Sequence, residues 1–205
     1  MIDLESFPLP LLILSALFLL LIVLVEVRVL TYAYRKIGVH PRYAFAVLLL
    51  SLIGSFKNIE LFTMRSTGDA GTSGSIVVVL NVGGALIPIL VSLYLVARTQ
   101  MYVRMLIATG LVAAIVHNLA WVVPGAGIAV PIIVPPLVAA GVALVLAFRR
   151  APPVAYVAGS MGTLIGADLM NLGKIGQIGA PVVSIGGAGT FDGVFLTGLI
   201  AGLLA

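Results

Sequence analysis

The stretch Leu9–Val25 reads LPLLILSALFLLLIVLV and contains no charged residue. A helix needs about 20 apolar residues to cross the hydrocarbon core of a bilayer. A signal peptide begins with Lys or Arg and ends with a small-residue cleavage site. This run is instead preceded by Asp3 and Glu5 without any Lys or Arg, and no such cleavage site follows it. We therefore expect a retained first transmembrane helix at about residues 9–30.

The same apolar character continues through the chain. Of its 205 residues, 61% are hydrophobic and 9% are charged, whereas soluble domains average about 45–50% and about 25%. Lipid solvates an apolar exterior of this kind. We expect an all-α bundle in a single integral membrane domain, residues 1–205, with about seven transmembrane helices near 9–30, 43–61, 75–97, 103–122, 127–148, 153–172 and 190–205.

The basic residues predict an orientation, because Lys and Arg accumulate in cytoplasmic loops. With the N-terminus outside, the loops after the first, third and fifth spans are cytoplasmic. Those loops and their flanks hold Arg28, Arg35, Lys36, Arg42, Arg98, Arg104, Arg149 and Arg150, against Lys57, Arg65 and Lys174 on the other side. We expect a multi-pass protein of the cell (cytoplasmic) membrane. Because the basic residues sit at helix ends rather than in a stripe, no nucleic-acid partner is expected.

An internal repeat is visible in the sequence. Pro41–Gly54 (PRYAFAVLLLSLIG) aligns without gaps on Pro153–Gly166 (PVAYVAGSMGTLIG), and a Gly-Gly-Ala follows each block, at residues 83–85 and 186–188. The alignment predicts a parallel 3+1+3 arrangement. Its parts are repeat one at about 9–97, a linker helix at about 103–122 and repeat two at about 127–205. Parallel repeats occur in transporters, whose sites lie at the interface between repeats.

Few polar residues interrupt the expected spans, and most fall toward the outer side. Ionisable groups inside a bilayer are costly and usually face the bundle interior or a wet cavity. We expect a binding site formed by Asp168, Asp192, Asn171, Lys57, Glu60, His117 and Asn118. Lys57 and Asp168, which correspond in the repeat, would form a buried ion pair. No spacing motif for a metal is present, so neither a metal nor a cofactor is expected.

Prolines and glycines give two further expectations. Pro88 and Pro135 fall inside expected spans, and helices broken by proline often flank transporter sites. Gly162 and Gly166 lie four residues apart, as do Gly198 and Gly202. Small residues at this spacing predict close helix packing.

Three blocks in the C-terminal half together resemble a widespread family of short prokaryotic polytopic membrane proteins without an assigned function. They are His117-Asn118 followed by PGAGI at 124–128 and Pro135-Pro136, then GTLIGADL at 162–169, then GTFDG at 189–193. The resemblance implies a prokaryotic cytoplasmic membrane. It brings no activity, cofactor or catalytic residue.

Three functions fit these patterns. The leading hypothesis is a transporter or channel-like protein for a small solute or ion. Membrane lipids are its expected partners, and the sequence leaves open whether it forms a homo-oligomer. The second is an intramembrane aspartyl-type hydrolase with an Asp168–Asp192 dyad. Intramembrane aspartyl proteases carry Gly-x-Gly-Asp after an aromatic-Asp motif, whereas Ile165–Asp168 lacks both glycines and Phe191-Asp192 comes second. The third is a non-catalytic membrane scaffold.

Overall fold

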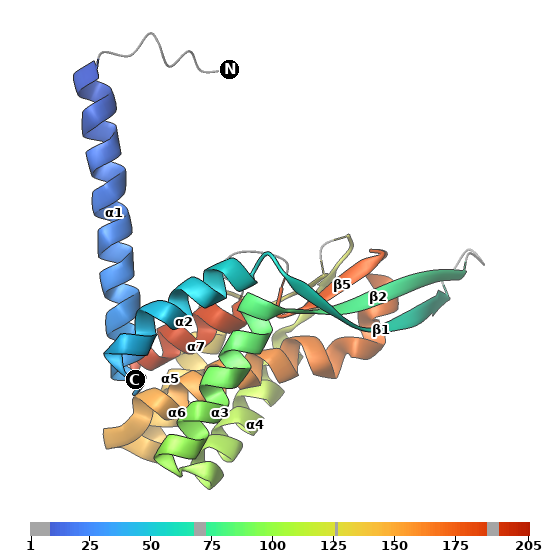
Figure 1. Ribbon diagram of the computed structural model, residues 1–205. Coiled ribbons are helices and arrows are strands. Elements are labelled where there is room, and N and C mark those ends of the chain that lie inside the picture. Colours follow the sequence, from blue (N-terminus) through green and yellow to red (C-terminus); the bar gives the residue numbers. More distant parts are fainter. Residues whose placement is uncertain (1–8, 68–72, 126, 188–192) are drawn as a thin grey trace.

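Helices make up most of the computed structural model, which describes residues 9–67, 73–125, 127–187 and 193–205 (Figure 1). The α-helices are α1 (Leu9–Lys36), α2 (Pro41–Gly54), α3 (Ile87–Thr99), α4 (Tyr102–Leu119), α5 (Val134–Ala147), α6 (Ala151–Thr163) and α7 (Gly193–Leu204). Helices α2 to α7 form one bundle. Helix α1 projects away from it and is buried only near its own C-terminal end.

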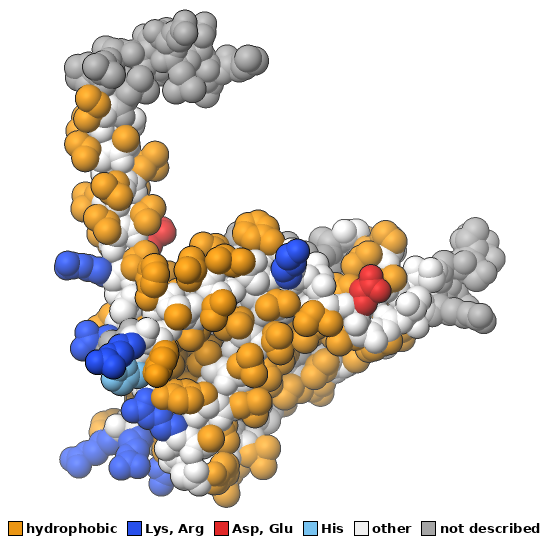
Figure 2. Space-filling view, in the orientation of Figure 1, with side chains coloured by type: hydrophobic (Ala, Val, Ile, Leu, Met, Phe, Trp, Pro, Cys, Tyr) orange, Lys and Arg blue, Asp and Glu red, His pale blue; other side chains and the backbone are white. Residues whose placement is uncertain are grey.

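One end of the bundle gathers the ends of several helices. Lys36 Nζ donates to Leu203 O at 2.7 Å, and Arg98 donates to Gly38 O, which brings the ends of α1, α3 and α7 together. A Cβ on Gly202 would lie 3.5 Å from a backbone oxygen in the first turn of α6. Figure 2 shows most of the Lys and Arg side chains of this face at the same end. We call it the basic end.

A small sheet extends from the opposite end of the bundle (Figure 1). Strand β1 (Asn58–Thr67) pairs antiparallel with β2 (Ser73–Asn81), and β2 pairs in parallel with β5 (Val182–Ile185), so the strand order is β1-β2-β5. A separate pair joins the short strands β3 (Trp121–Val123) and β4 (Gly127–Ala129). The fold is therefore mostly helical rather than all-α.

The strands correct three of the expected spans. Residues 58–61 and 75–81, expected in the second and third transmembrane helices, are strand, and α2 ends at Gly54. The fifth span was expected from residue 127, but its helix begins at Val134. The reason is local, because Ile76 and the valines after it are β-branched and favour strands. A short apolar run does not by itself distinguish a strand from a buried helix.

Among the residues that the structure describes, four helical segments are long and apolar enough to cross a membrane: Ile13–Lys36, Val82–Thr99, Tyr102–Leu119 and Val134–Gly176. The longest of these contains both α5 and α6. The chain reverses between them at a short 3₁₀ turn, Phe148–Arg150, and the two helices pack against each other. Helices α2 and α7 are shorter apolar helices.

Irregular helical turns interrupt the bundle at two places. A π-turn, η2 (Val82–Leu86), precedes α3, and a second, η4 (Leu164–Asp168), follows α6 and leads into the 3₁₀ segment η5 (Leu169–Gln177). Pro135 lies in the first turn of α5, where a missing backbone donor costs little. Pro88 lies inside the apolar helical segment Val82–Thr99, directly after the π-turn η2, so an irregular turn accompanies this proline.

Glycines allow the helices to approach closely, as their spacing predicted. A Cβ on Gly162 would lie 2.6 Å from Val112 Cγ1, and one on Gly166 would overlap the backbone oxygen of Ala113. Helix α4 therefore packs directly on α6 and η4. A Cβ on Gly198 would meet Ser160 Oγ, so α7 packs on α6 in the same way.

Candidate functional site

A row of polar side chains runs along the buried face of α6 and continues past η4. Tyr156, Ser160 and Thr163 are spaced by four and three residues, so they lie on one face of the helix. Asn171 follows beyond the π-turn. The four side chains are between 0% and 2% exposed. We call them the α6 polar row, and it is roughly 20 Å long at 1.5 Å per helical residue.

The polar row is poorly satisfied by hydrogen bonds. Within the part of the chain that the structure describes, Thr163 Oγ1 and Asn171 Oδ1 have no hydrogen-bond partner. A buried polar atom without a partner costs about 1–3 kcal/mol, and native proteins contain few. Two such atoms, one on α6 and one in the segment that follows η4, make the polar row a candidate site.

The end of the row nearest the basic end is a cluster of three hydroxyls. The rings of Tyr34 and Tyr156 lie 6.3 Å apart. The hydroxyls of Tyr34, Tyr156 and Ser160 are close enough to interact, although none makes a hydrogen bond of good geometry with described residues. Tyr34 and Tyr156 are both 0% exposed. Helix α1 therefore contributes one hydroxyl beside the buried row through its packed C-terminal turns.

At its other end the row reaches the π-turn η4 and its carboxylate. Asp168 is half-buried, and its Oδ2 accepts a hydrogen bond from Gly186 N at 2.8 Å. Asn171 Nδ2 donates to Gly166 O and Ala167 O, both at 2.9 Å, which satisfies carbonyls at the irregular turn. Single π-turns inside helices are frequent at functional sites.

The π-turn η2 contacts the turn after β5, which itself binds Asp168 of η4. A Cβ on Gly186 would lie 2.7 Å from Ala85 N, so the two backbones touch. Asn81, which is 0% exposed, fixes η2 by accepting from Gly84 N at 2.8 Å and donating to Ser55 O at 2.8 Å. Gly186 contacts both Ala85 of η2 and the Asp168 carboxylate of η4, so η2, η4 and the turn after β5 form a junction beside Asp168.

The structure brings some of the expected site residues to this junction. Asp168 and Asn171 are there. His117 is half-buried in the last turn of α4, and its Nδ1 lacks a partner among the described residues. It lies one helical turn beyond Ala113, which contacts Gly166, so it is on the side of α4 that faces η4.

The other expected site residues lie elsewhere. Lys57 and Glu60 are exposed, at the turn after α2 and on β1, so a buried Lys57–Asp168 ion pair is not formed. Asn118 is exposed and donates to Ala114 O at 2.7 Å. Asp192 lies outside the described residues, so the Asp168–Asp192 dyad stays a prediction.

Sequence reasoning missed the row itself. Tyr156, Ser160 and Thr163 carry no charge and have many alanine and glycine neighbours, which are typical of packing, and Tyr34 lies beside Arg35 and Lys36, which indicated a helix end. The four- and three-residue spacing along α6 was the available signal. In the described ranges, no three His, Asp or Glu side chains come close enough to share a metal ion.

The fold and this site define a mostly helical protein with several membrane-crossing candidates and a buried polar row, which suggests an integral membrane protein. The chain belongs to the family described as "Protein of unknown function (DUF1614)", whose sequence model matches residues 20–204. No curated protein and no solved structure matches the chain. The family brings no transport activity with it.

Proposed function

We propose that this protein is a multi-pass protein of the cell membrane that moves a small cation, with the proton as the first candidate, along the α6 polar row to Asp168. The observation that carries the proposal is the row of buried, poorly satisfied hydroxyl and amide groups that passes η4, where Asp168 supplies a half-buried carboxylate. Polar chains inside membrane proteins mark ion and proton pathways.

The chemistry of the row favours a cation. Hydroxyl and amide oxygens and a carboxylate are ligands for hard cations, and hydroxyls also relay protons. The row contains no Lys or Arg that would attract an anion. The hydroxyl cluster near the basic end and Asp168 near the opposite end supply polar groups over much of the depth of the bundle.

The membrane placement rests on the basic end. Because Lys and Arg accumulate on the cytoplasmic side, the basic end faces the cytoplasm and the N-terminus lies outside. Helices α1 to α7 then supply the seven spans. Open sheet edges do not occur in lipid, so the β1-β2-β5 sheet lies beyond the hydrocarbon on the outer side. Helices α2 and α7, at 14 and 12 residues, cross only with the segments that adjoin them.

The order of elements supports a parallel repeat. In each half, a helix (α2 or α6) leads through a connection to a strand (β2 or β5), then to Gly-Gly-Ala, then to a further helix (α3 or α7). The two strands are parallel neighbours. Asp168 accepts from Gly186, which contacts Ala85 of the other half, so the proposed site lies at the repeat interface where transporter sites occur.

Reconstitution of the full chain in liposomes tests the proposal. A potassium diffusion potential drives proton entry, which a trapped pH dye reports, and parallel assays follow Na⁺ and K⁺. Asp168→Asn keeps an acceptor for Gly186 N and removes the charge. It should lower the cation flux by about tenfold or more. This factor corresponds to the free energy of one hydrogen bond to a charged group.

The matched control is Glu26→Gln, which removes an exposed carboxylate on α1 and should leave the flux unchanged. Wild-type liposomes that pass none of the three cations would overturn the proposal. So would an Asp168→Asn variant that is less stable yet conducts as the wild type does, because the carboxylate would then be structural, as in a scaffold.

A further inference from the structure

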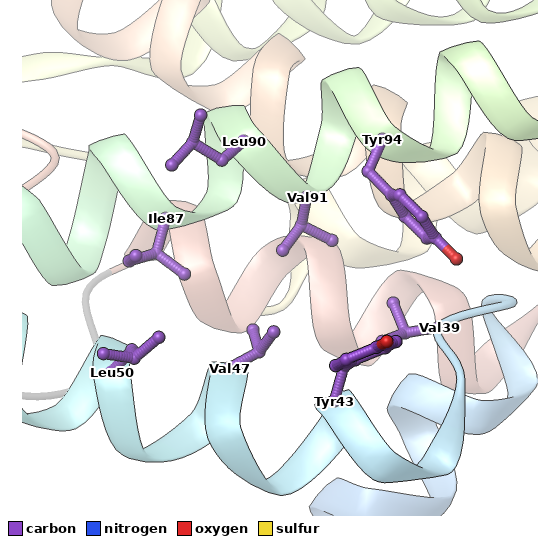
Figure 3. Close-up of a pocket in the computed structure, with 8 residues that line it drawn as sticks. All are labelled: Val39, Tyr43, Val47, Leu50, Ile87, Leu90, Val91 and Tyr94. Carbon is purple, nitrogen blue, oxygen red and sulfur yellow. The ribbon is translucent and has the colours of Figure 1, made fainter.

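A groove of about 260 Å³ runs between α2 and α3 on the outside of the bundle (Figure 3). Apart from two tyrosine hydroxyls its walls are aliphatic or aromatic carbon. Helix α2 contributes one wall and α3 the other, and the lining residues are Val39, Tyr43, Val47, Leu50, Ile87, Leu90, Val91 and Tyr94. From Tyr43 to Leu50 the groove follows α2 for roughly 10 Å.

The two ends of the groove differ in chemistry. Tyr43 and Tyr94 lie together at one end, and Leu50 and Leu90 lie toward the other (Figure 3). The tyrosine end is the basic end of the bundle. There Arg98 Nη1 donates to Tyr94 OH at 2.9 Å, and its guanidinium carbon lies 5.8 Å from the Tyr94 ring centroid.

The charge at the tyrosine end has one sign. Arg42 is exposed beside Tyr43, and the ring of His40 lies 5.9 Å from that of Tyr43. Neither α2 nor α3 contains Asp or Glu. A ligand complementary to this groove is apolar along its length and anionic at one end.

We propose that the groove holds an acyl chain of an anionic phospholipid, with the phosphate at Arg98 and Arg42. Basic pockets between membrane helices on the cytoplasmic side bind anionic headgroups, and Tyr and Arg concentrate at that interface. The inference uses the membrane placement proposed above, which puts the tyrosine end at the cytoplasmic headgroups. It does not use the cation pathway.

Native mass spectrometry of the delipidated full chain in detergent, titrated with phosphatidylglycerol or phosphatidylcholine, tests the inference. The wild type should bind phosphatidylglycerol about fivefold more tightly, the value of one basic residue near a membrane surface. Arg98→Gln should remove that preference. Leu90→Trp fills the groove and should abolish binding of the first lipid of either kind.

Two variants on α4 are the matched controls. Arg104→Gln removes another exposed basic residue at the same end, and Leu106→Trp enlarges another exposed leucine, so neither should change the first binding step. Equal affinity for the two lipids would overturn the inference, as would an equal loss from Arg104→Gln. A stable dimer that excludes lipid and is lost in Leu90→Trp would also overturn it, because a second copy would then fill the groove. Lipid binding is measured independently of cation flux, so failure of the lipid proposal can be distinguished from failure of the cation proposal.

Discussion

Helices α1 and α6 present opposite surfaces although both are rich in apolar residues. The most apolar stretch of α1 has no buried residue, and its side chains are large leucines, isoleucines and valines. Ten of the 13 residues of α6 are buried, and these are mainly alanine, glycine, valine and hydroxyl residues. Of the four membrane-crossing candidates, the one with the highest mean hydropathy is therefore the least packed, and the polar row lies on the most packed helix.

The contrast follows from the solvent. Lipid is as apolar as leucine, so large apolar side chains gain little by packing on protein, and α1 exposes them. Close helix approach needs small residues, and it also encloses any polar group on the same face. The α6 polar row is therefore shielded from lipid by the glycine and alanine contacts that surround it. The three predictions below test this contrast, from the largest expected effect to the smallest.

Gly166→Ala should have the largest effect on stability. The added Cβ overlaps the backbone of Ala113, which cannot move away as a side chain could. We expect the free energy of unfolding, measured by SDS titration, to fall by about 3 kcal/mol. Gly110→Ala on α4 is the control, because nothing lies within 4 Å of its Cβ, and it should gain up to about 1 kcal/mol from helix propensity. Equal values for the two variants would mean that α4 and α6 are not in close contact.

Thr163→Val should separate stability from flux. It keeps the shape of the side chain and removes an unpartnered buried hydroxyl, so the free energy of unfolding should rise by about 1 kcal/mol. Cation flux should fall by about fivefold, the value of one neutral hydrogen bond. Thr99→Val is the control, because its hydroxyl donates to Leu95 O at 2.8 Å and its loss should destabilise the protein. A less stable Thr163→Val variant would show that this hydroxyl has a structural partner.

Leu17→Ala on α1 should have the smallest effect. Its side chain is 57% exposed, and surface substitutions usually change the free energy of unfolding by less than about 0.5 kcal/mol. Leu95→Ala removes the same atoms from a fully buried site on α3 and sets the scale for a packed leucine. A loss at Leu17 close to that at Leu95 would show that α1 packs against another copy of the chain.

Composition and periodicity predicted the apolar helices because long apolar runs have few alternative structures. The glycine spacing at 162 and 166 also predicted the contact between helices. The hairpin of β1 and β2 was missed because an apolar run of strand length fits a helix equally well until its hydrogen-bond partner is known. Strand β2 forms hydrogen bonds on its second edge with β5, which is distant in the sequence.

The candidate site was predicted only in part. Charged and amide residues are visible in the sequence, but the burial of each side chain is not. Asp168 and Asn171 were singled out and do lie at the η4 junction. Lys57 and Glu60 were singled out for the same reason but are exposed. The buried face of α6 is determined by the contacts of Gly162 with α4 and of Gly198 with α7. These are tertiary contacts, which the local sequence does not specify.

Because β2 pairs in parallel with β5, the sheet cannot be completed until late in synthesis of the chain. Val77 pairs with Val182, and at about 5–20 residues per second the roughly hundred residues between them take about 5–20 s to make. During that interval the second edge of β2 has no partner, and an unpaired strand edge is a template for pairing with other chains. Neighbouring nascent copies can therefore pair through β2 until β5, in the last eighth of the chain, has been made.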